Sequence, residues 1–338
     1  YKPAQDYAYR RWGQKYCDEI EIGFAPIDGK ALAHLPLQKE FLQELGLINP
    51  QGYDFFQNRI VIPIKDRYQH IIGFTARVMD DSQPKYLNSK ESLLYSKRST
   101  VFGLDVAWRA AGKTGQMYLV EGAPDCMRLH AIGVQNAVAD LGSAWTVEQF
   151  QLIKRAANKV CFIPDNDPLK GGADYGTGIE AVMKAGKLAT EQHLTVSVKE
   201  ITTTEEGKKE DPDTYFKNQT LFKAVEEEDF ILWLAAKLFE KSGNTEQKSD
   251  AVKRIAHLLS FIDDDTKLTM FIDALTKYHR GKLFWQKAIE NERTRRDSPK
   301  EDDIDLNRQY GFWIDRGKYF STTEKSGVLE WSNFTLTP

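Results

Sequence analysis

The sequence predicts an α/β protein with a parallel sheet at its centre, an N-terminal α+β part and a C-terminal bundle of helices. Two observations lead to this fold class. Between residues 115 and 200, short apolar runs alternate with helical patterns, which is typical of a parallel sheet with helices on its faces. Between residues 214 and 295, apolar side chains recur at helical spacing, which favours a small helical bundle.

The elements of the parallel sheet follow from these runs in order. We expect strands at residues 116–120, 135–139, 159–163 and 193–201. The helices between them are expected at residues 124–132, 146–157 and 175–189.

Before the sheet, the predicted secondary structure changes near residue 58 from helices to strands. Residues 1–57 have helical patterns joined by short loops, and Gly13 and Gly46 end two of these helices. Residues 58–65 and 71–78 predict a hairpin around a polar turn, and residues 85–89 predict a loop.

The C-terminal part is predicted to hold several kinds of segment. Residues 291–305 are highly charged and predict a solvated linker, and three short strands are expected within residues 310–334. The domain boundaries expected from the whole chain are 1–112 for the α+β part, 113–215 for the parallel sheet, 216–295 for the bundle, and 296–338 for the linker and the strands.

Composition narrows the class of protein. The chain has 338 residues, of which 41% are hydrophobic and 28% charged, and no apolar run approaches the ~20 residues of a membrane helix. No secretory signal opens the chain, so we expect a cytoplasmic protein without a membrane partner. The start at Tyr1, without an initiator Met, suggests a fragment or a processed product. Cys17, Cys126 and Cys161 form no Cys-x-x-Cys pair, which predicts buried free thiols rather than zinc or disulfides. The net charge of −3 does not by itself indicate a nucleic-acid-binding protein.

Three short acidic clusters are the main candidates for chemistry. Two of them follow apolar runs that predict buried strands, and the third lies in a charged loop. Carboxylates at the ends of parallel strands meet at one edge of the sheet, where they suit two or more Mg²⁺ or Mn²⁺ ions. The residues are Glu121 and Asp125, Asp165 and Asp167, and Asp211 and Asp213.

Each cluster also has a purely structural interpretation. Asp125 lies just after Pro124 in the first turn of a predicted helix, so it could simply cap that helix. Asp165 and Asp167 could form an Asx-turn, and the acidic loop around Pro212 could simply be solvated.

Basic and aromatic side chains gather before the sheet and suit a single-stranded nucleic acid or a triphosphate. The alternative is a solvated hairpin face, which fits Lys65 and Arg67 best. Gly142, in the loop before the helix at 146–157, permits close approach of a phosphate to the backbone. The other residues of this group are Arg59, Arg77, Lys85, Tyr86, Lys97 and Arg98.

The ordered set of motifs resembles the catalytic core of bacterial DnaG-type primases, whose second half is the TOPRIM fold. The motifs are Asn58-Arg-x-x-x-Pro-Ile, Ile72-Gly-Phe-x-x-Arg77, Lys85-Tyr-Leu-Asn-Ser89, Val120-Glu-Gly-x-x-Asp125, Asp140-Leu-Gly-Ser143 and Asp165-x-Asp167. The resemblance covers roughly residues 5–280. Taken in this order the motifs are specific, although each alone is not.

The resemblance implies a DNA primase, a DNA-directed RNA polymerase that makes short RNA primers on single-stranded DNA from ribonucleoside triphosphates with Mg²⁺ or Mn²⁺. Glu121, Asp165 and Asp167 take the catalytic positions, and Asp125, Asp211 and Asp213 match further acidic positions. The residues that match the family's template and nucleotide surface are Arg59, Arg77, Lys85 and Asn88. A replicative helicase is the partner that the family implies.

The chain departs from the family pattern in three places. Asn166 stands where glycine is usual, residues 168–174 lengthen the following loop, and the N-terminal zinc-ribbon of the family is absent. We therefore expect an excised core from a phage or mobile-element replication protein, with no zinc in this piece.

Two other functions remain as alternatives. Another TOPRIM enzyme, a topoisomerase or a nuclease, would use the same carboxylates, but nothing in the sequence marks the nucleophilic tyrosine of a topoisomerase. A non-catalytic module that binds single-stranded DNA or a helicase would not need them. The sequence does not indicate the template triplet, primer length, choice of metal, helicase identity or oligomeric state.

Overall fold

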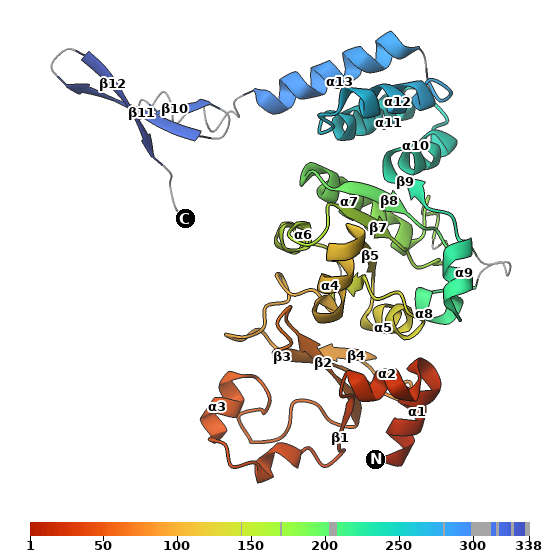
Figure 1. Cartoon of the computed structure of the whole chain (residues 1–338), viewed down its shortest axis with the longest axis vertical. Coiled ribbons are helices and arrows are strands. Elements are labelled where there is room, and N and C mark those ends of the chain that lie inside the picture. Colours follow the sequence, from red (N-terminus) through yellow and green to blue (C-terminus); the bar gives the residue numbers. More distant parts are fainter. Residues whose placement is uncertain are drawn as a thin grey trace. The chain divides into compact units, whose positions relative to one another are not determined.

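A computed structural model describes residues 1–142, 144–169, 171–202, 208–279, 281–298, 312–315, 318–325 and 328–334 of the chain (Figure 1). The chain forms two compact units, Tyr1–Lys241 and Ser242–Pro338. In the part that the structure describes, no helix is both long and apolar enough to cross a membrane.

An antiparallel sheet of four strands organises the start of the first unit. Helices α1 (Lys2–Trp12) and α2 (Gln14–Glu19) come first, and a 3-10 helix (Ala31–His34) and α3 (Lys39–Glu44) lie between the first two strands. The hairpin predicted from the sequence is confirmed as β2 and β3. The strands, in spatial order, are β1 (Gly23–Ala25), β2 (Arg59–Lys65), β3 (Ile71–Arg77) and β4 (Tyr86–Asn88).

Two predictions for this region are wrong. Residues 85–89 were expected in a loop, but β4 pairs with β3 there, with Ala76 opposite Leu87. Residues 1–57 were expected to be helical, but β1 pairs with β2, with Phe24 opposite Ile60. Both strands have only three residues, which is too short to show the period-two pattern that identifies strands.

The predicted parallel sheet follows. Its strands are β5 (Gln116–Val120), β6 (Ala137–Ala139), β7 (Lys159–Phe162) and β8 (Thr195–Val198), and the short antiparallel β9 (Glu228–Asp229) lies at one edge. The helices between the strands, and α4 before them, are α4 (Leu104–Thr114), α5 (Ala123–Ala131), α6 (Val147–Lys154) and α7 (Thr177–Glu191).

The order of the strands positions the site. The spatial order is β6-β5-β7-β8-β9, so the chain moves one way from β5 to β6 and then returns past β5 to β7. Because crossovers between parallel strands are right-handed, α5 lies on one face of the sheet, and α6 and α7 lie on the other. The crevice between the ends of β5 and β7 is therefore a topological switch point, where α/β proteins bind ligands.

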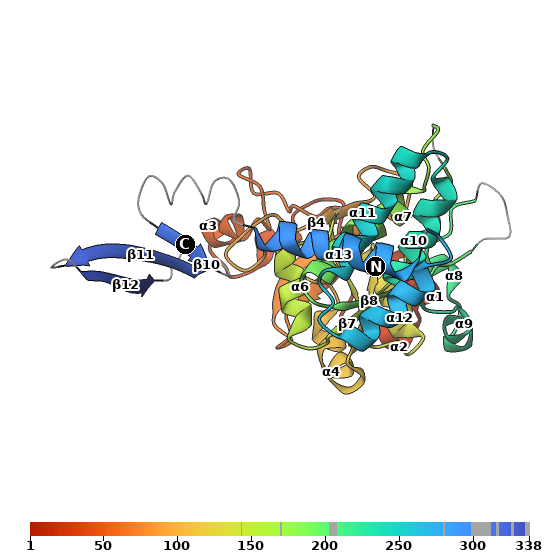
Figure 2. The same ribbon diagram turned by 90° about the horizontal axis from the view of Figure 1, so that it is seen from above.

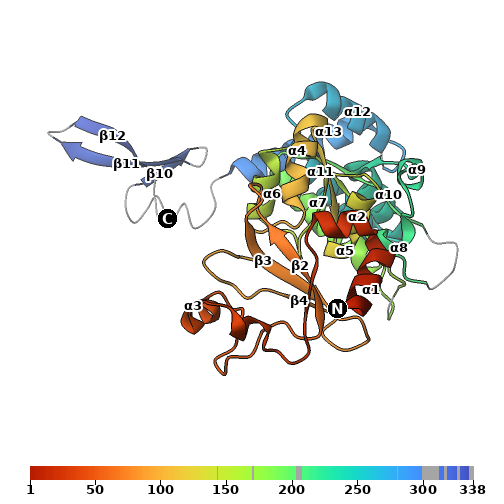
Figure 3. The ribbon, with the colours of Figure 1, turned by 60° about the horizontal axis from the view of Figure 1, so that its bottom comes forward.

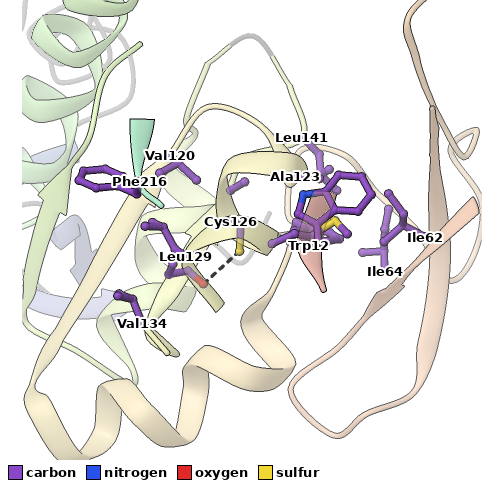
Figure 4. Close-up of a cluster of buried hydrophobic side chains, with 14 of the residues drawn as sticks. Trp12, Ile62, Ile64, Val120, Ala123, Cys126, Leu129, Val134, Leu141 and Phe216 are labelled. Carbon is purple, nitrogen blue, oxygen red and sulfur yellow. Dashed lines mark hydrogen bonds between the residues drawn. The ribbon is translucent and has the colours of Figure 1, made fainter. Parts of the chain in front are cut away.

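One hydrophobic core joins the antiparallel sheet to the parallel one. Figure 4 shows Trp12 of α1 beside Ile62 and Ile64 of β2, with Cys126 of α5 close by. Trp12 is 2% exposed and both isoleucines are 0% exposed. Burying side chains of this size contributes about 1.5–3 kcal/mol each, so the two sheets stabilise one another. Cys17, Cys126 and Cys161 are free and buried, as predicted.

Helices α8 (Pro212–Tyr215), α9 (Gln219–Ala224) and α10 (Phe230–Lys241) complete the first unit. Helices α1, α5 and α8 lie side by side in Figure 3. The contact between α10 and the parallel sheet is close, because a Cβ on Gly186 of α7 would stand 2.4 Å from the ring of Phe230.

The second unit contains α11 (Thr245–Leu259), α12 (Asp265–Leu275) and α13 (Lys282–Asp297), followed by three antiparallel strands. The strands β10 (Phe312–Asp315), β11 (Lys318–Lys325) and β12 (Val328–Phe334) confirm the predicted short strands (Figure 2). The linker predicted at residues 291–305 is wrong as far as residue 297, because α13 continues through it. Arg293 and Arg296 donate to the carbonyls of Ile262 and Ser260, which anchors this charged segment as a helix. Residues 299–305 lie outside the described residues.

Candidate active site

The first catalytic candidate, Glu121, directly follows β5. In the pairing of β5 with β7, Leu119 stands opposite Phe162, so Glu121 and Asp165 emerge side by side at the carboxyl end of the sheet. A Cβ added to Gly178 of α7 would stand 2.8 Å from Glu121 Oε1 and 2.4 Å from the carbonyl oxygen of Asp165. The start of α7 therefore closes over both residues, and only glycine fits there.

Burial changes the acidity of Glu121. Desolvation, followed by the charges of Asp165 and Asp167, raises the pKa of Glu121 to about 7. A carboxylate with this pKa can exchange a proton near neutral pH.

Asp165 and Asp167 form the second pair and share one cation. Lys209 Nζ lies 2.9 Å from Asp165 Oδ2 and 2.8 Å from Asp167 Oδ1. Asp167 Oδ2 accepts hydrogen bonds from Thr177 Oγ1 and from the Gly178 amide at the start of α7. Burial raises the pKa of Asp165, whereas the bonds from Lys209 and Thr177 outweigh burial and lower the pKa of Asp167.

The third acidic segment joins the other two through a backbone bridge. Asn166 and Glu210 exchange two N–H···O bonds of 2.8 and 3.1 Å, which bring Lys209 and Asp211 to the site. Asp211 caps α8 by accepting a bond of 2.8 Å from the Thr214 amide. Its charge adds to the effect of burial in raising the pKa of Asp165.

Asp125 and Asp213 accept hydrogen bonds that connect the segments around the site. Asp125 accepts bonds of 3.1 Å from the Gly122 and Asp213 amides, so the helix-capping alternative describes its contacts. Asp213 Oδ2 accepts from Arg11 Nε at 2.6 Å, and Oδ1 accepts from Arg128 Nε at 3.1 Å. Both oxygens of each carboxylate therefore accept hydrogen bonds from neighbouring groups.

Whether a divalent cation fits the site depends on which carboxylate oxygens have no hydrogen-bond partner in the protein. Among the residues that the structure describes, no three His, Cys, Asp or Glu side chains stand ready as metal ligands. Lys209 lies between the aspartates, and its ammonium marks a position for positive charge. Within the same described residues, Glu121 Oε1 and Asp165 Oδ1 are buried without a hydrogen-bond partner. Buried carboxylate oxygens of this kind suit Mg²⁺ or Mn²⁺, so the residues fit the ion once Lys209 moves aside.

A cavity of about 540 Å³ opens beside Glu121, between α7 and the loop that carries Gly142 and Trp145. Its floor is apolar, with Leu119 and Phe162, and Asp140 and Trp145 form part of its wall. Burial raises the pKa of Asp140 to about 6.

The loop that carries Gly142 is held in place by the antiparallel sheet. Asn88 Nδ2 donates to the carbonyl of Leu141 at 2.7 Å, and Asp140 Oδ1 accepts from the Gly142 amide at 3.2 Å. Gly142 is exposed, and its position for a Cβ lies 3.1 Å from Lys97 Cε. Gly142, Asn88 and Lys97 therefore gather at the rim of the site.

The basic residues divide into two groups. Arg59 and Arg77 are each only 8% exposed. Arg59 Nη1 donates to the carbonyl of Pro84 at 2.8 Å, and Arg77 donates to the hydroxyls of Tyr7 and Tyr86. These two arginines therefore hold β4 and α1 against the sheet. Lys85 and Lys97 are exposed and available to an anion.

Comparisons with known proteins decide the family. Residues 1–108 match the family described as DNA primase catalytic core, N-terminal domain, and residues 118–216 match the family described as Toprim-like. The chain belongs to the DnaG-type primase family. It is 38% identical to the DNA primase of Clostridium acetobutylicum over 181 residues, which are 51% of this chain and 30% of that protein. It is 32% identical to the DNA primase of Listeria innocua over 269 residues, which are 75% of this chain and 40% of that protein.

A solved primase structure shows the same fold. The zinc-binding and RNA polymerase domains of the Aquifex aeolicus primase superpose with a TM-score of 0.67 and 26% identity, over 84% of this chain and 69% of that one. The matches to the curated primases span less than half of those proteins, between 25% and 40% for the first four. The predicted fold, an α/β primase core with a Toprim sheet, is confirmed.

Several residues of this primase core were not predicted from the sequence. Lys209 lies in a charged loop that looks solvated, and no local pattern marks its contact with Asp165. Arg11 and Arg128 lie in separate helices and meet at Asp213 only in the folded chain. Gly178 could have been found, because a glycine near the start of a helix that follows an acidic pair suggests close approach of another chain segment.

Proposed function

We propose that this chain is the catalytic core of a DNA primase, which synthesises short RNA primers on single-stranded DNA from ribonucleoside triphosphates. The observation that carries this proposal is the meeting of Glu121, Asp165 and Asp167 at the switch point of a Toprim sheet. The N-terminal match supports it further, because residues 1–108, before that sheet, match the N-terminal domain of a DNA primase catalytic core.

Up to two ions of Mg²⁺ or Mn²⁺ would be held by Asp165, Asp167 and Glu121. Asp211 would lie near these ions. When bound, such ions lower the pKa of a primer 3′-hydroxyl and neutralise charge on the phosphates. Glu121 would hold an ion or accept the hydroxyl proton, and in the metal-free chain its pKa is raised to about 7. Asp125 and Asp213 would act through position, by fixing the loops that carry the other carboxylates.

The template and nucleotide surface would be the rim formed by Lys85, Lys97, Asn88 and Gly142. The exposed ammonium groups attract phosphates, and the buried Arg59 and Arg77 would shape this surface without touching the nucleic acid. A solved DnaG primase catalytic domain bound to single-stranded DNA shares this fold, with 24% identity and a TM-score of 0.65 over 85% of this chain and 90% of that one.

A replicative helicase is the proposed protein partner. We also propose four domains, with boundaries at residues 112/113, 215/216 and 295/296. Binding of a helicase to the full chain, measured with purified proteins, tests the first of these. Limited proteolysis tests the second. The boundaries at 112/113 and 295/296 lie within α4 and α13, so resistance to cleavage at these positions would reject them.

The proposed activity is tested by incubating the chain with single-stranded templates of varied sequence, labelled ribonucleotides, and Mg²⁺ or Mn²⁺. Short labelled RNA that depends on the template supports a primase. Nicking of a supercoiled plasmid without RNA synthesis would support a topoisomerase or nuclease instead. DNA binding without either reaction would support a non-catalytic module.

A further inference from the structure

Lys209 is the one cation seen between Asp165 and Asp167 in the described part of the site. Hydrogen bonds of the neighbouring residue fix the position of its backbone, but not of its ammonium. The bridge between Asn166 and Glu210 sets the backbone of Lys209 beside the loop of Asp165 and Asp167. From there its ammonium reaches both carboxylates, at 2.9 and 2.8 Å.

The ammonium can leave without a change of backbone. The side chain of Lys209 is 53% exposed, whereas those of Asp165 and Asp167 are each 9% exposed. Four flexible carbons separate the charge from the backbone, so Lys209 can turn toward solvent while the aspartates cannot.

One ammonium does not satisfy this site. Three carboxylates of Glu121, Asp165 and Asp167 face a single charge from Lys209, and two of their oxygens are buried without a partner in the described structure. The site is therefore arranged for more positive charge than Lys209 brings.

We propose that Lys209 is an internal counter-cation, which bridges Asp165 and Asp167 in the metal-free protein and withdraws when a divalent cation is bound. The inference rests on the metal site of the proposed function. It follows that metal binding is an exchange of cations, so Lys209 weakens the affinity for metal while it prevents the carboxylates from repelling one another in the metal-free fold.

The first experiment is a calorimetric titration of Mn²⁺ into the wild-type chain and the Lys209→Met variant. In the variant, Mn²⁺ no longer has to displace an ammonium that makes two partly exposed ion pairs. The variant should therefore bind Mn²⁺ on the order of threefold to tenfold more tightly than wild type. Lys187→Met is the matched control, since Lys187 is 54% exposed and pairs with Glu191 away from the aspartates. Its affinity for Mn²⁺ should stay within about twofold of wild type.

A second measurement uses the wild-type protein and does not depend on the folding of a variant. The rate of acylation of Lys209 by a water-soluble reagent, followed by mass spectrometry, should rise when Mg²⁺ is added. The rate at Lys187 should not change. A rate at Lys209 that falls or stays constant contradicts the withdrawal of the ammonium.

The outcomes separate this inference from the proposed function. Equal or weaker Mn²⁺ binding by Lys209→Met overturns the role of Lys209 and leaves primer synthesis unaffected as a proposal. Tighter binding without any RNA synthesis supports the exchange and contradicts the primase activity. Absence of Mn²⁺ binding to wild type and variant alike rejects the metal site itself, and with it both proposals.

Discussion

Arg11, in the first helix, donates a hydrogen bond of 2.6 Å from Nε to the carboxylate of Asp213, in the segment that brings Lys209 to the site. Asp213 is 3% exposed, and Arg128 binds its second oxygen. The N-terminal helix is thereby tied to the acidic site by a buried ion pair that crosses most of the sequence. Together with the shared hydrophobic core, this contact joins the primase N-terminal part to the Toprim sheet.

Replacing Arg11 by Met should destabilise the chain, because Asp213 would keep its buried charge and lose one of two cations. We expect the free energy of unfolding to fall by about 2–3 kcal/mol, near the lower end for breaking a buried pair. Chemical denaturation measures this change. Arg10→Met, at an exposed position in the same helix, is the control and should change stability by less than about 0.5 kcal/mol. Equal effects of the two substitutions would contradict the role given to Arg11.

The division of the basic residues predicts two different effects. Lys97→Ala should weaken binding of single-stranded DNA about equally for all sequences and reduce the salt dependence of binding by about one unit of slope, with stability unchanged. Arg59→Ala should instead lower the melting temperature, because the carbonyl of Pro84 loses its buried donor. DNA binding at several salt concentrations and thermal unfolding measure the two effects. Loss of affinity without loss of stability in Arg59→Ala would show that Arg59 contacts DNA directly.

Glu121 should make stability depend on pH in metal-free buffer. Its pKa is raised from 4.5 to about 7 in the folded chain, so between these values the folded state binds more protons than the unfolded state. Stability should therefore fall as pH rises through this window. Glu121→Gln removes the buried charge, so the variant should match wild type near pH 4 and exceed it by about 3 kcal/mol near pH 8. Denaturation at both pH values with a chelator present provides the measurement, and equal stabilities at pH 8 would contradict the raised pKa.

Gly178 allows α7 to begin against the site, so Gly178→Ala should disturb Glu121 and Asp165 directly. The added Cβ would stand 2.4 Å from the carbonyl oxygen of Asp165, and the resulting shift of α7 should reduce primer synthesis by about a hundredfold. Gly112→Ala in α4 is the control, because a Cβ there meets no described atom within 4 Å. That substitution should stabilise the helix by up to about 1 kcal/mol and leave synthesis unchanged. Initial rates of labelled ribonucleotide incorporation compare the two.

The sequence predicted the Toprim sheet well because its strands are buried on both faces. Runs such as residues 159–163 are apolar throughout, and glycines and charged residues separate them from amphipathic helices. The same reasoning found the edge where Glu121 and Asp165 emerge, since the carboxyl ends of neighbouring parallel strands always meet.

The remaining contacts could not be predicted, because they depend on residues far apart in sequence. Arg59 and Arg77 looked like surface cations, but tyrosine hydroxyls and carbonyl oxygens from other segments enclose them. Arg11 and Arg128 reach Asp213 from two helices, and no local pattern around Asp213 indicates these contacts. The charged end of α13 looked like a linker, and only its bonds to Ile262 and Ser260 reveal why it is helical.

The most direct test of the primase assignment is template-dependent ribonucleotide incorporation by the double variant Asp165→Ala, Asp167→Ala beside the wild-type chain. Thermal unfolding and single-stranded DNA binding of both proteins confirm that the fold and the basic rim persist. The account predicts labelled primers from the wild type and none from the variant, with the fold retained. Full primer synthesis by the variant would contradict it.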